Sequence, residues 1–418
     1  MLAAVSYALR QTKSPCYKKA VTNCIYKVLH ATGTAFIVPR KKAIRRPSGV
    51  QSMTLLMPPG PDLGLARKIL STPFRHHKWF ALCPFMLRSM KRIPSLDGLR
   101  AISISMVVIG HWTSLRYHWE VGGAFANLGV RIFFVISGYL ITTLLLQERA
   151  QSSTIQLREF YVRRAYRILP AAIVFMLPVF VIYWGQLRWY HMAAAALYVT
   201  NFDPWHPWFL GHLWSLSVEE QFYFLWPGVL KKWHQHRTAI LAGVILFAPL
   251  YRVACHLLKL HGRADETFPA VADVLAIGCL LAIYAARLPR IKTPWACALV
   301  PTVALVPVYV AAVHFRTTPL LLLVLWPLLH LSIAGLLLHV VQSPYWILNL
   351  KPVAWLGKIS YSLYLWQQLF AYGPQHRNWY WLFAPVGLAS LSYYLVEQPM
   401  LRLRQKRQVR ERAYAQAA

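Results

Sequence analysis

The chain has 418 residues, of which 57% are hydrophobic and 14% are charged. Soluble domains carry about 25% charged residues, so this composition excludes an ordinary soluble domain and predicts a polytopic membrane protein. The 45 Lys and Arg against 13 Asp and Glu would indicate nucleic-acid binding in a soluble protein. Here the cations lie between apolar runs, as membrane topology requires, and we expect no nucleic-acid partner.

Residues 1–90 differ in composition from the rest of the chain. They hold fifteen Lys and Arg, a single acid, and no apolar run long enough to span a bilayer. Such a segment is predicted to be a basic, poorly ordered leader. It resembles a presequence, but the abrupt change of composition after Met90 favours a translation start at Met53, Met86 or Met90.

The membrane domain is expected over residues 91–404, followed by a basic tail at 405–418. Spanning a bilayer takes about 20 mostly apolar residues. Eleven apolar runs are candidates: 101–118, 128–147, 169–186, 189–202, 208–230, 238–257, 269–286, 295–314, 319–341, 353–372 and 379–400.

The run at 189–202 is short and weakly apolar, and we expect it to be re-entrant or interfacial. The other ten runs then place RRAYR, KKWHQHR, RLPRIK, Lys351 and both termini in the cytoplasm, as the positive-inside rule favours. The predicted fold is therefore an all-α bundle of about ten spanning helices in the inner (plasma) membrane. No cysteine pair has CxxC spacing, so we expect no disulfide framework and no metal site.

The first apolar run carries ionisable groups at both ends. In the segment SLDGLRAISISMVVIGH, Arg100 and His111 are eleven residues apart. On a helix they share one face, about 20° past three full turns, with a rise of about 16 Å. With Arg100 at the cytoplasmic surface, His111 lies near the middle of the bilayer, where an ionisable residue usually has a function. The simpler alternative is a packed histidine that donates to a backbone carbonyl.

A second polar cluster lies in GHLWSLSVEEQFYFLWP, at residues 211–227. His212, Ser215 and Glu219 share one face of a single helix. Glu219 and Glu220 need partners inside a membrane, and protonated His111 or an arginine is expected to serve.

A capping box is the competing interpretation of this cluster, with Ser217 as N-cap and Glu220 three residues later. That helix would keep about thirteen residues, too few to span. We therefore expect a longer helix from about Trp208.

Two further motifs have both structural and functional interpretations. Ser137 and Gly138 in FFVISGYLI predict either close packing of helices through small residues or a local break that exposes the backbone to a ligand. Arg164 and Arg167 in RRAYRILP share one face, as an anchor for anionic lipid or as a phosphate clamp.

Taken together, these segments resemble the acyltransferase-3 family of membrane O-acyltransferases, from about Ile93 to Pro399. The motifs are IPSLDGLRAISISMVVIGH, GVRIFFVISGYLI, FYVRRAYRILP, HLWSLSVEEQFYFLWP, KISYSLYLWQ and YYLVEQP. The resemblance implies an enzyme that takes an acyl group, by default acetyl, from cytoplasmic acyl-CoA. The acceptor would be a hydroxyl of an exported or surface molecule, such as a carbohydrate or a lipid-linked glycan. No tightly bound cofactor is implied.

The resemblance and the residue chemistry together suggest a mechanism. His111 is the candidate general base, and Glu219 or Glu220 is expected to orient its ring as the acid does in a triad.

Donor and acceptor binding are assigned to the remaining polar positions: Arg100, Arg164, Arg167, Ser137, His212 and Ser215. The three arginines would hold the CoA phosphates, and Ser137 would donate to the oxyanion or give the pantetheine arm room. We expect direct transfer without an acyl-enzyme. The alternative function is a proton-coupled secondary transporter with a mid-membrane histidine and broken helices.

Overall fold

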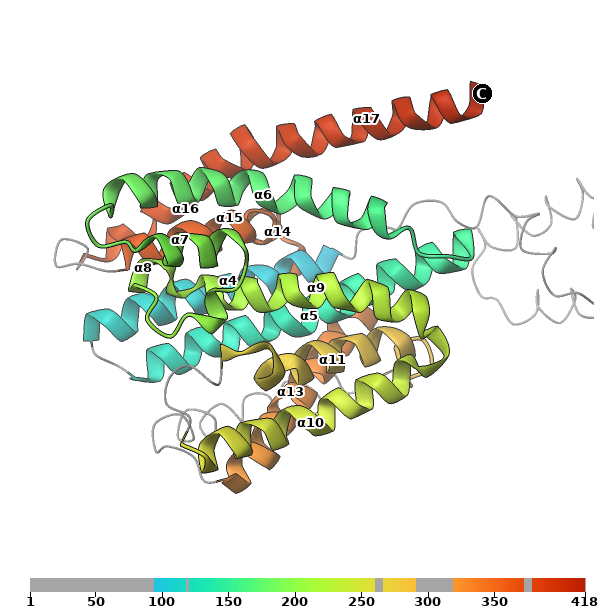
Figure 1. Cartoon of the computed structure of the whole chain (residues 1–418), viewed down its shortest axis with the longest axis horizontal. Helices are drawn as coiled ribbons and strands as arrows, with labels where there is room; N and C mark the ends of the chain where they lie inside the picture. The colour runs from blue at the N-terminus through green and yellow to red at the C-terminus, as the bar shows by residue number, and fades with distance from the viewer. Residues whose placement is uncertain (1–93, 118–119, 260–265, 291–318, 372–377, 418) are drawn as a thin grey trace, which may run out of the picture. The chain divides into compact units, whose positions relative to one another are not determined.

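The computed structural model describes residues 94–117, 120–259, 266–290, 319–371 and 378–417, and every regular element in these ranges is helical (Figure 1). This confirms the all-α prediction for the described part of the chain. The expected leader at 1–90 and the expected span at 295–314 lie outside the described residues.

The elements follow in chain order. They are α4 (Pro94–Tyr117), α5 (Glu120–Ser152), α6 (Leu157–Ile182), α7 (Trp189–Ala196), η2 (Thr200–Phe202), α8 (Trp208–Gly211), α9 (Leu213–Lys232), η3 (His234–His236), α10 (Arg237–Leu257), α11 (Phe268–Tyr284), α13 (Pro319–Gln342), η6 (Ile347–Asn349), α14 (Lys351–Lys358), α15 (Ser360–Trp366), η7 (Gln367–Phe370), η9 (Trp379–Leu382), α16 (Ala384–Ser392), the π-helical turn η10 (Tyr393–Glu397) and α17 (Gln398–Ala417).

Among the described helices, four are long and apolar enough to cross a membrane: Val121–Ser152, Leu157–Ile182, His234–Leu257 and Leu322–Gln342. The shorter helix Phe268–Tyr284 is also apolar. The protein is therefore a helical membrane protein, but the predicted count of about ten spans is not confirmed. The last two predicted spans are each divided into shorter helices, and the basic tail continues α17.

Helix α5 forms the centre of the bundle, and α6 and α10 lie at its periphery. In the most apolar stretch, 72% of α5 is buried, against 28% of α6 and of α10. The outer faces of these two helices expose large apolar side chains such as Leu177, Val181 and Leu246. An apolar surface of this kind needs a lipid surrounding.

Gly138 allows α5 and α11 to pack backbone against backbone. A Cβ atom on Gly138 would lie 2.1 Å from the carbonyl oxygen of Leu275, and one on Gly278 would lie 2.3 Å from that of Val135. Because α5 is continuous from Glu120 to Ser152, the interpretation as close packing is confirmed. The alternative of a local helix break is wrong.

A buried network of charged side chains links α5, α10, α11 and α13. Arg131 Nη1 donates to His330 Nε2 at 2.8 Å, and His330 Nδ1 lies 3.1 Å from Asp273 Oδ2. Since an arginine only donates, His330 is neutral and its Nδ1–H donates to Asp273. Arg252 Nη2 donates to the same carboxylate oxygen at 2.9 Å. All four residues are at most 2% exposed, so the network fixes the register of four helices.

The two ends of the segment 184–208 lie close together. The ring of Tyr183, directly after α6, stacks on that of Phe209 in α8 with centroids 4.0 Å apart. Between them the chain dips beside α9, where the Thr200 N–H donates to Ser217 Oγ at 3.1 Å. Helix α7 has only 8 residues, or about 12 Å. This helix is too short to span a bilayer by itself, and the re-entrant or interfacial placement of 189–202 stays a prediction.

Candidate active site

His111 is held on one side by a glutamine from a distant part of the chain. Its Nδ1 lies 3.0 Å from Gln367 Oε1 at the start of η7. A carbonyl oxygen only accepts, so Nδ1 carries the proton and Nε2 keeps its lone pair. Within the described part of the chain, Nε2 has no hydrogen-bond partner. The imidazole therefore has the tautomer of a general base.

The two acids of α9 have other partners. Ser137 Oγ donates to Glu219 Oε1 at 2.8 Å, and the hydroxyl of Tyr223 donates to its other oxygen at 3.4 Å. Arg164 Nη2 donates to Glu220 Oε1 at 3.0 Å.

No carboxylate of α9 contacts the histidine ring, contrary to the expected triad geometry. Gln367 occupies the orienting position instead. It is the last residue of the motif KISYSLYLWQ, and no role was predicted for it.

The predicted arginines lie together near the end of the bundle at which α4 begins. The guanidinium of Arg164 lies 3.2 Å above the centre of the Tyr223 ring. Arg167, one turn later, is exposed and lies within electrostatic range of Arg100, Arg164 and the buried carboxylate of Glu397. These three guanidinium groups, which we call the cationic cluster, lie within electrostatic range of three carboxylates, those of Glu219, Glu220 and Glu397. The positive charge of the cluster is therefore largely balanced, and what it offers to a phosphate group is N–H donors.

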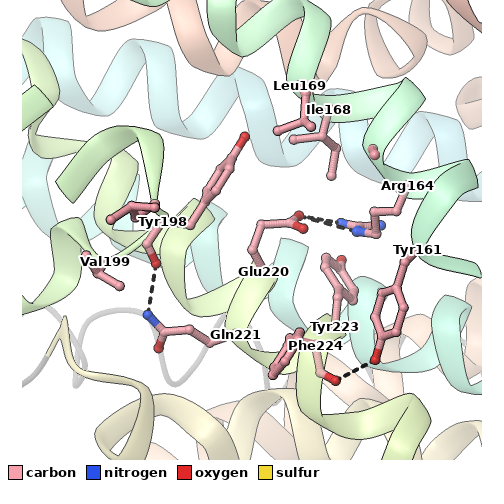
Figure 2. A pocket seen from close by; sticks show the side chains of 12 residues that line it. Tyr161, Arg164, Ile168, Leu169, Tyr198, Val199, Glu220, Gln221, Tyr223 and Phe224 are labelled. Atoms are coloured by element: carbon pink, nitrogen blue, oxygen red, sulfur yellow. Dashed lines mark hydrogen bonds and ion pairs between the residues drawn. The ribbon is translucent and has the colours of Figure 1, made fainter. Parts of the chain in front are cut away.

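A cavity of about 430 Å³ opens between α6 and α9 beside this cationic cluster. Figure 2 shows its two polar walls, the pair of Arg164 with Glu220 and the contact of Gln221 with the Tyr198 carbonyl. Its other walls are mainly apolar and aromatic, and Tyr161 on α6 donates to the Phe224 carbonyl on α9. The cavity is therefore mainly apolar, with its charged groups confined to the Arg164–Glu220 pair.

A second, small cavity of about 50 Å³ brings three predicted positions together. Arg100, Ser215 and Glu219 all line it, along with Ser360 and Tyr364 of α15. Arg100 is the one residue of α4 in its lining, and His111 does not line it. The cavity therefore joins Arg100 to Ser215 and Glu219, with a far wall from α15 that was not predicted, and a polar path onward to His111 stays a prediction.

His212 and Ser215 do not lie on one helix as predicted, but both contact Tyr364. His212 interrupts the expected helix between α8 and α9. The Tyr364 hydroxyl donates to the His212 carbonyl at 2.9 Å and lies 2.5 Å from Ser215 Oγ. Ser217 is inside α9 and donates to the Leu213 carbonyl at 2.9 Å, so the capping-box alternative is wrong.

In the residues that the structure describes, no group of three or more His, Cys, Asp or Glu side chains is arranged to hold a metal ion.

Comparison with known proteins places this site in a family. A family model described as "Acyltransferase domain" matches residues 93–396. The peptidoglycan O-acetyltransferase OatA of Listeria monocytogenes is 31% identical over 320 residues, covering 66% of this chain and 49% of that protein. The putative peptidoglycan O-acetyltransferase YrhL of Bacillus subtilis is 29% identical over 360 residues, covering 74% and 55%.

The shared region is limited in extent. The chain spans about half the length of these two curated relatives. A putative O-acetyltransferase of Staphylococcus aureus is 41% identical over 164 residues, 34% of this chain and 25% of that protein. The comparison with solved structures gives no significant match.

Proposed function

The chain belongs to the acyltransferase-3 family, and on that premise we propose that it transfers an acetyl group from acetyl-CoA to a carbohydrate hydroxyl within the membrane. The observation that carries the proposal is the pairing of His111 Nδ1 with Gln367 Oε1, 3.0 Å apart. This pairing directs the basic Nε2 away from the glutamine and leaves it without a partner among the described residues.

The reaction follows from that tautomer. Nε2 of His111 removes the proton of the acceptor hydroxyl as its oxygen attacks the thioester carbonyl. The tetrahedral intermediate then expels the CoA thiolate, which takes the proton back from the imidazolium. The acetyl ester, CoA–SH and neutral His111 remain, so no covalent acyl-enzyme is needed.

The three arginines of the cationic cluster can donate hydrogen bonds to the phosphate groups of the donor. Arg100, Arg164 and Arg167 bind the CoA phosphates in this proposal, at the end of the bundle that the charge distribution assigns to the cytoplasm. The 430 Å³ cavity beside Arg164 supports it, because the cavity has room for part of an extended nucleotide thioester. With that orientation, both termini are cytoplasmic and the membrane is the plasma membrane.

The positions of Arg100 and His111 on α4 support transfer across the membrane. Arg100 and His111 lie on one face of α4, about 16 Å apart along its axis. In this proposal the donor phosphates bind at Arg100, beside the small cavity lined by Ser215 and Glu219, and the acceptor hydroxyl binds at His111, farther along α4. The names of the Listeria monocytogenes and Bacillus subtilis relatives support a peptidoglycan hydroxyl as the acceptor.

The test measures CoA thiol release from acetyl-CoA by the purified full-length protein, with a soluble N-acetylhexosamine disaccharide as acceptor. His111→Ala is expected to abolish release. His339→Ala is the matched control, because His339 is also a buried imidazole but bonds Tyr345 near the end of α13. Equal release by wild type and His111→Ala would refute the proposed base, and a stable labelled acyl-enzyme would refute direct transfer.

A further inference from the structure

Buried polar atoms without partners gather around the end of α4 that carries His111. They are both ring nitrogens of His206, Nε2 of Gln367 and Nε1 of Trp208. His206 is 5% exposed and Gln367 is 2% exposed. Buried polar groups are nearly always hydrogen-bonded, so these atoms indicate a place where a polar ligand completes the hydrogen bonding.

These atoms come from segments that the fold brings to one place. A Cβ atom on Gly211 would lie 3.1 Å from His206 Cε1 and 3.3 Å from Gln368 Nε2, so these side chains meet over Gly211. Gln368 Nε2 itself donates to the Trp208 carbonyl, which ties η7 to α8. The edge of the Trp208 ring contacts the ring of His111, with centroids 5.7 Å apart.

Gln367 joins this cluster to the candidate base. Its Oε1 accepts from His111 Nδ1, while its Nε2 remains buried and unpaired. One amide therefore fixes the base with one atom and offers a donor to a ligand with the other. His212 lies within electrostatic range of both His111 and His206. The imidazole of His206 is therefore in the same region as the candidate base His111.

The chemistry of the cluster selects the class of ligand. Imidazole, amide and indole groups offer both donors and acceptors, and an indole face also packs against apolar C–H groups. No Lys or Arg belongs to the cluster. The nearest carboxylate, Glu266, is partly exposed and lies 3.8 Å from His206 Nε2. This composition suits an uncharged, hydroxyl-rich ligand better than a phosphate or a cation.

We propose that His206, Trp208 and Gln367 form the acceptor site, and that this site binds an uncharged pyranose ring with one hydroxyl directed at His111. The inference rests on the proposed acetyl transfer and adds the residues that recognise the acceptor. In this arrangement the two substrates bind at different ends of α4, the donor phosphates near Arg100 and the sugar near His111.

The test compares steady-state constants of the purified full-length protein in lipid nanodiscs, with acetyl-CoA and chitobiose as substrates. His206→Asn and Trp208→Phe each remove a hydrogen-bonding group from the cluster. Each is expected to raise the KM for chitobiose about fivefold, the effect of one neutral hydrogen bond, and to leave the KM for acetyl-CoA unchanged. Trp355→Phe is the matched control, since that indole donates to Tyr394 elsewhere, and it should change neither constant.

The outcomes distinguish the site from the function. An unchanged KM for chitobiose in a folded Trp208→Phe variant would overturn the site, as would a KM for acetyl-CoA that rises in parallel. If His206→Asn does not fold, Trp208→Phe decides alone. If the wild type releases no CoA, the proposed function fails, and calorimetric titration of chitobiose into wild type and Trp208→Phe still tests the site. If the wild type binds Zn²⁺ and His206→Asn does not, the cluster is a metal site and the proposed acceptor site is overturned.

Discussion

Replacing Gln367 by leucine tests how the base is oriented. Leucine has nearly the same size as glutamine but cannot accept the Nδ1–H of His111. Gln367 is 2% exposed, so water does not readily take its place. The 3.0 Å contact is a full hydrogen bond, and its loss frees both the tautomer and the rotation of the ring.

The size of the effect follows from these two losses. A neutral hydrogen bond contributes about 1 kcal/mol, so the Nδ1–H tautomer loses about a fivefold preference. Displacement of a catalytic group by about 1 Å costs up to about 100-fold in rate. We therefore expect kcat to fall by about fivefold to 100-fold in Gln367→Leu, less than in His111→Ala.

The assay is CoA release at saturating acetyl-CoA, with kcat and KM determined separately. Gln367→Glu keeps an acceptor for Nδ1–H and should recover most of the kcat lost in the leucine variant. A purely structural role would give no such recovery. The reasoning is refuted if Gln367→Leu has the wild-type kcat, or if the leucine and glutamate variants are equally impaired while both remain folded.

Three other substitutions test the donor site, the buried network and the helix contact. Arg164→Gln should raise the KM for acetyl-CoA about tenfold or more through loss of a charged hydrogen bond, and an unchanged value would exclude phosphate binding there. Asp273→Leu should reduce the free energy of unfolding by about 3–5 kcal/mol because it leaves Arg252 buried without its carboxylate. Adding Arg252→Met should restore most of it in denaturant titrations, and an equally unstable double variant would contradict the ion-pair account. Gly138→Leu should lower the melting temperature sharply, whereas Gly243→Leu, with no atom within 4 Å of its added Cβ, should not; equal shifts would argue against backbone contact at Gly138.

Much of the site was predictable along one helix. Arg100 and His111 follow from the helical repeat, because both lie in a single uninterrupted helix with a fixed rise and rotation. Close packing at Gly138 was one of two interpretations of the sequence, and the short helix in 189–202 agrees with the short, weakly apolar run there, because both depend on local composition and length. The family resemblance then identified the same residues through their motifs.

The partners of these residues were not predictable in this way. Glu219 and Glu220 were expected to meet His111 and instead bond Ser137 and Arg164. A buried acid in a membrane must find some partner, but the sequence does not say which of several candidates lies nearest.

The sequence by itself determined that this is a helical membrane protein, which residues share a helix face, and where charge interrupts the apolar runs. These properties depend on neighbours within about a dozen residues. Only the tertiary structure decided that Gln367 orients His111, a contact between residues 256 positions apart. It also decided that Asp273 joins Arg252 and His330. Such contacts depend on how helices from distant parts of the chain pack, and helical periodicity carries no information about that.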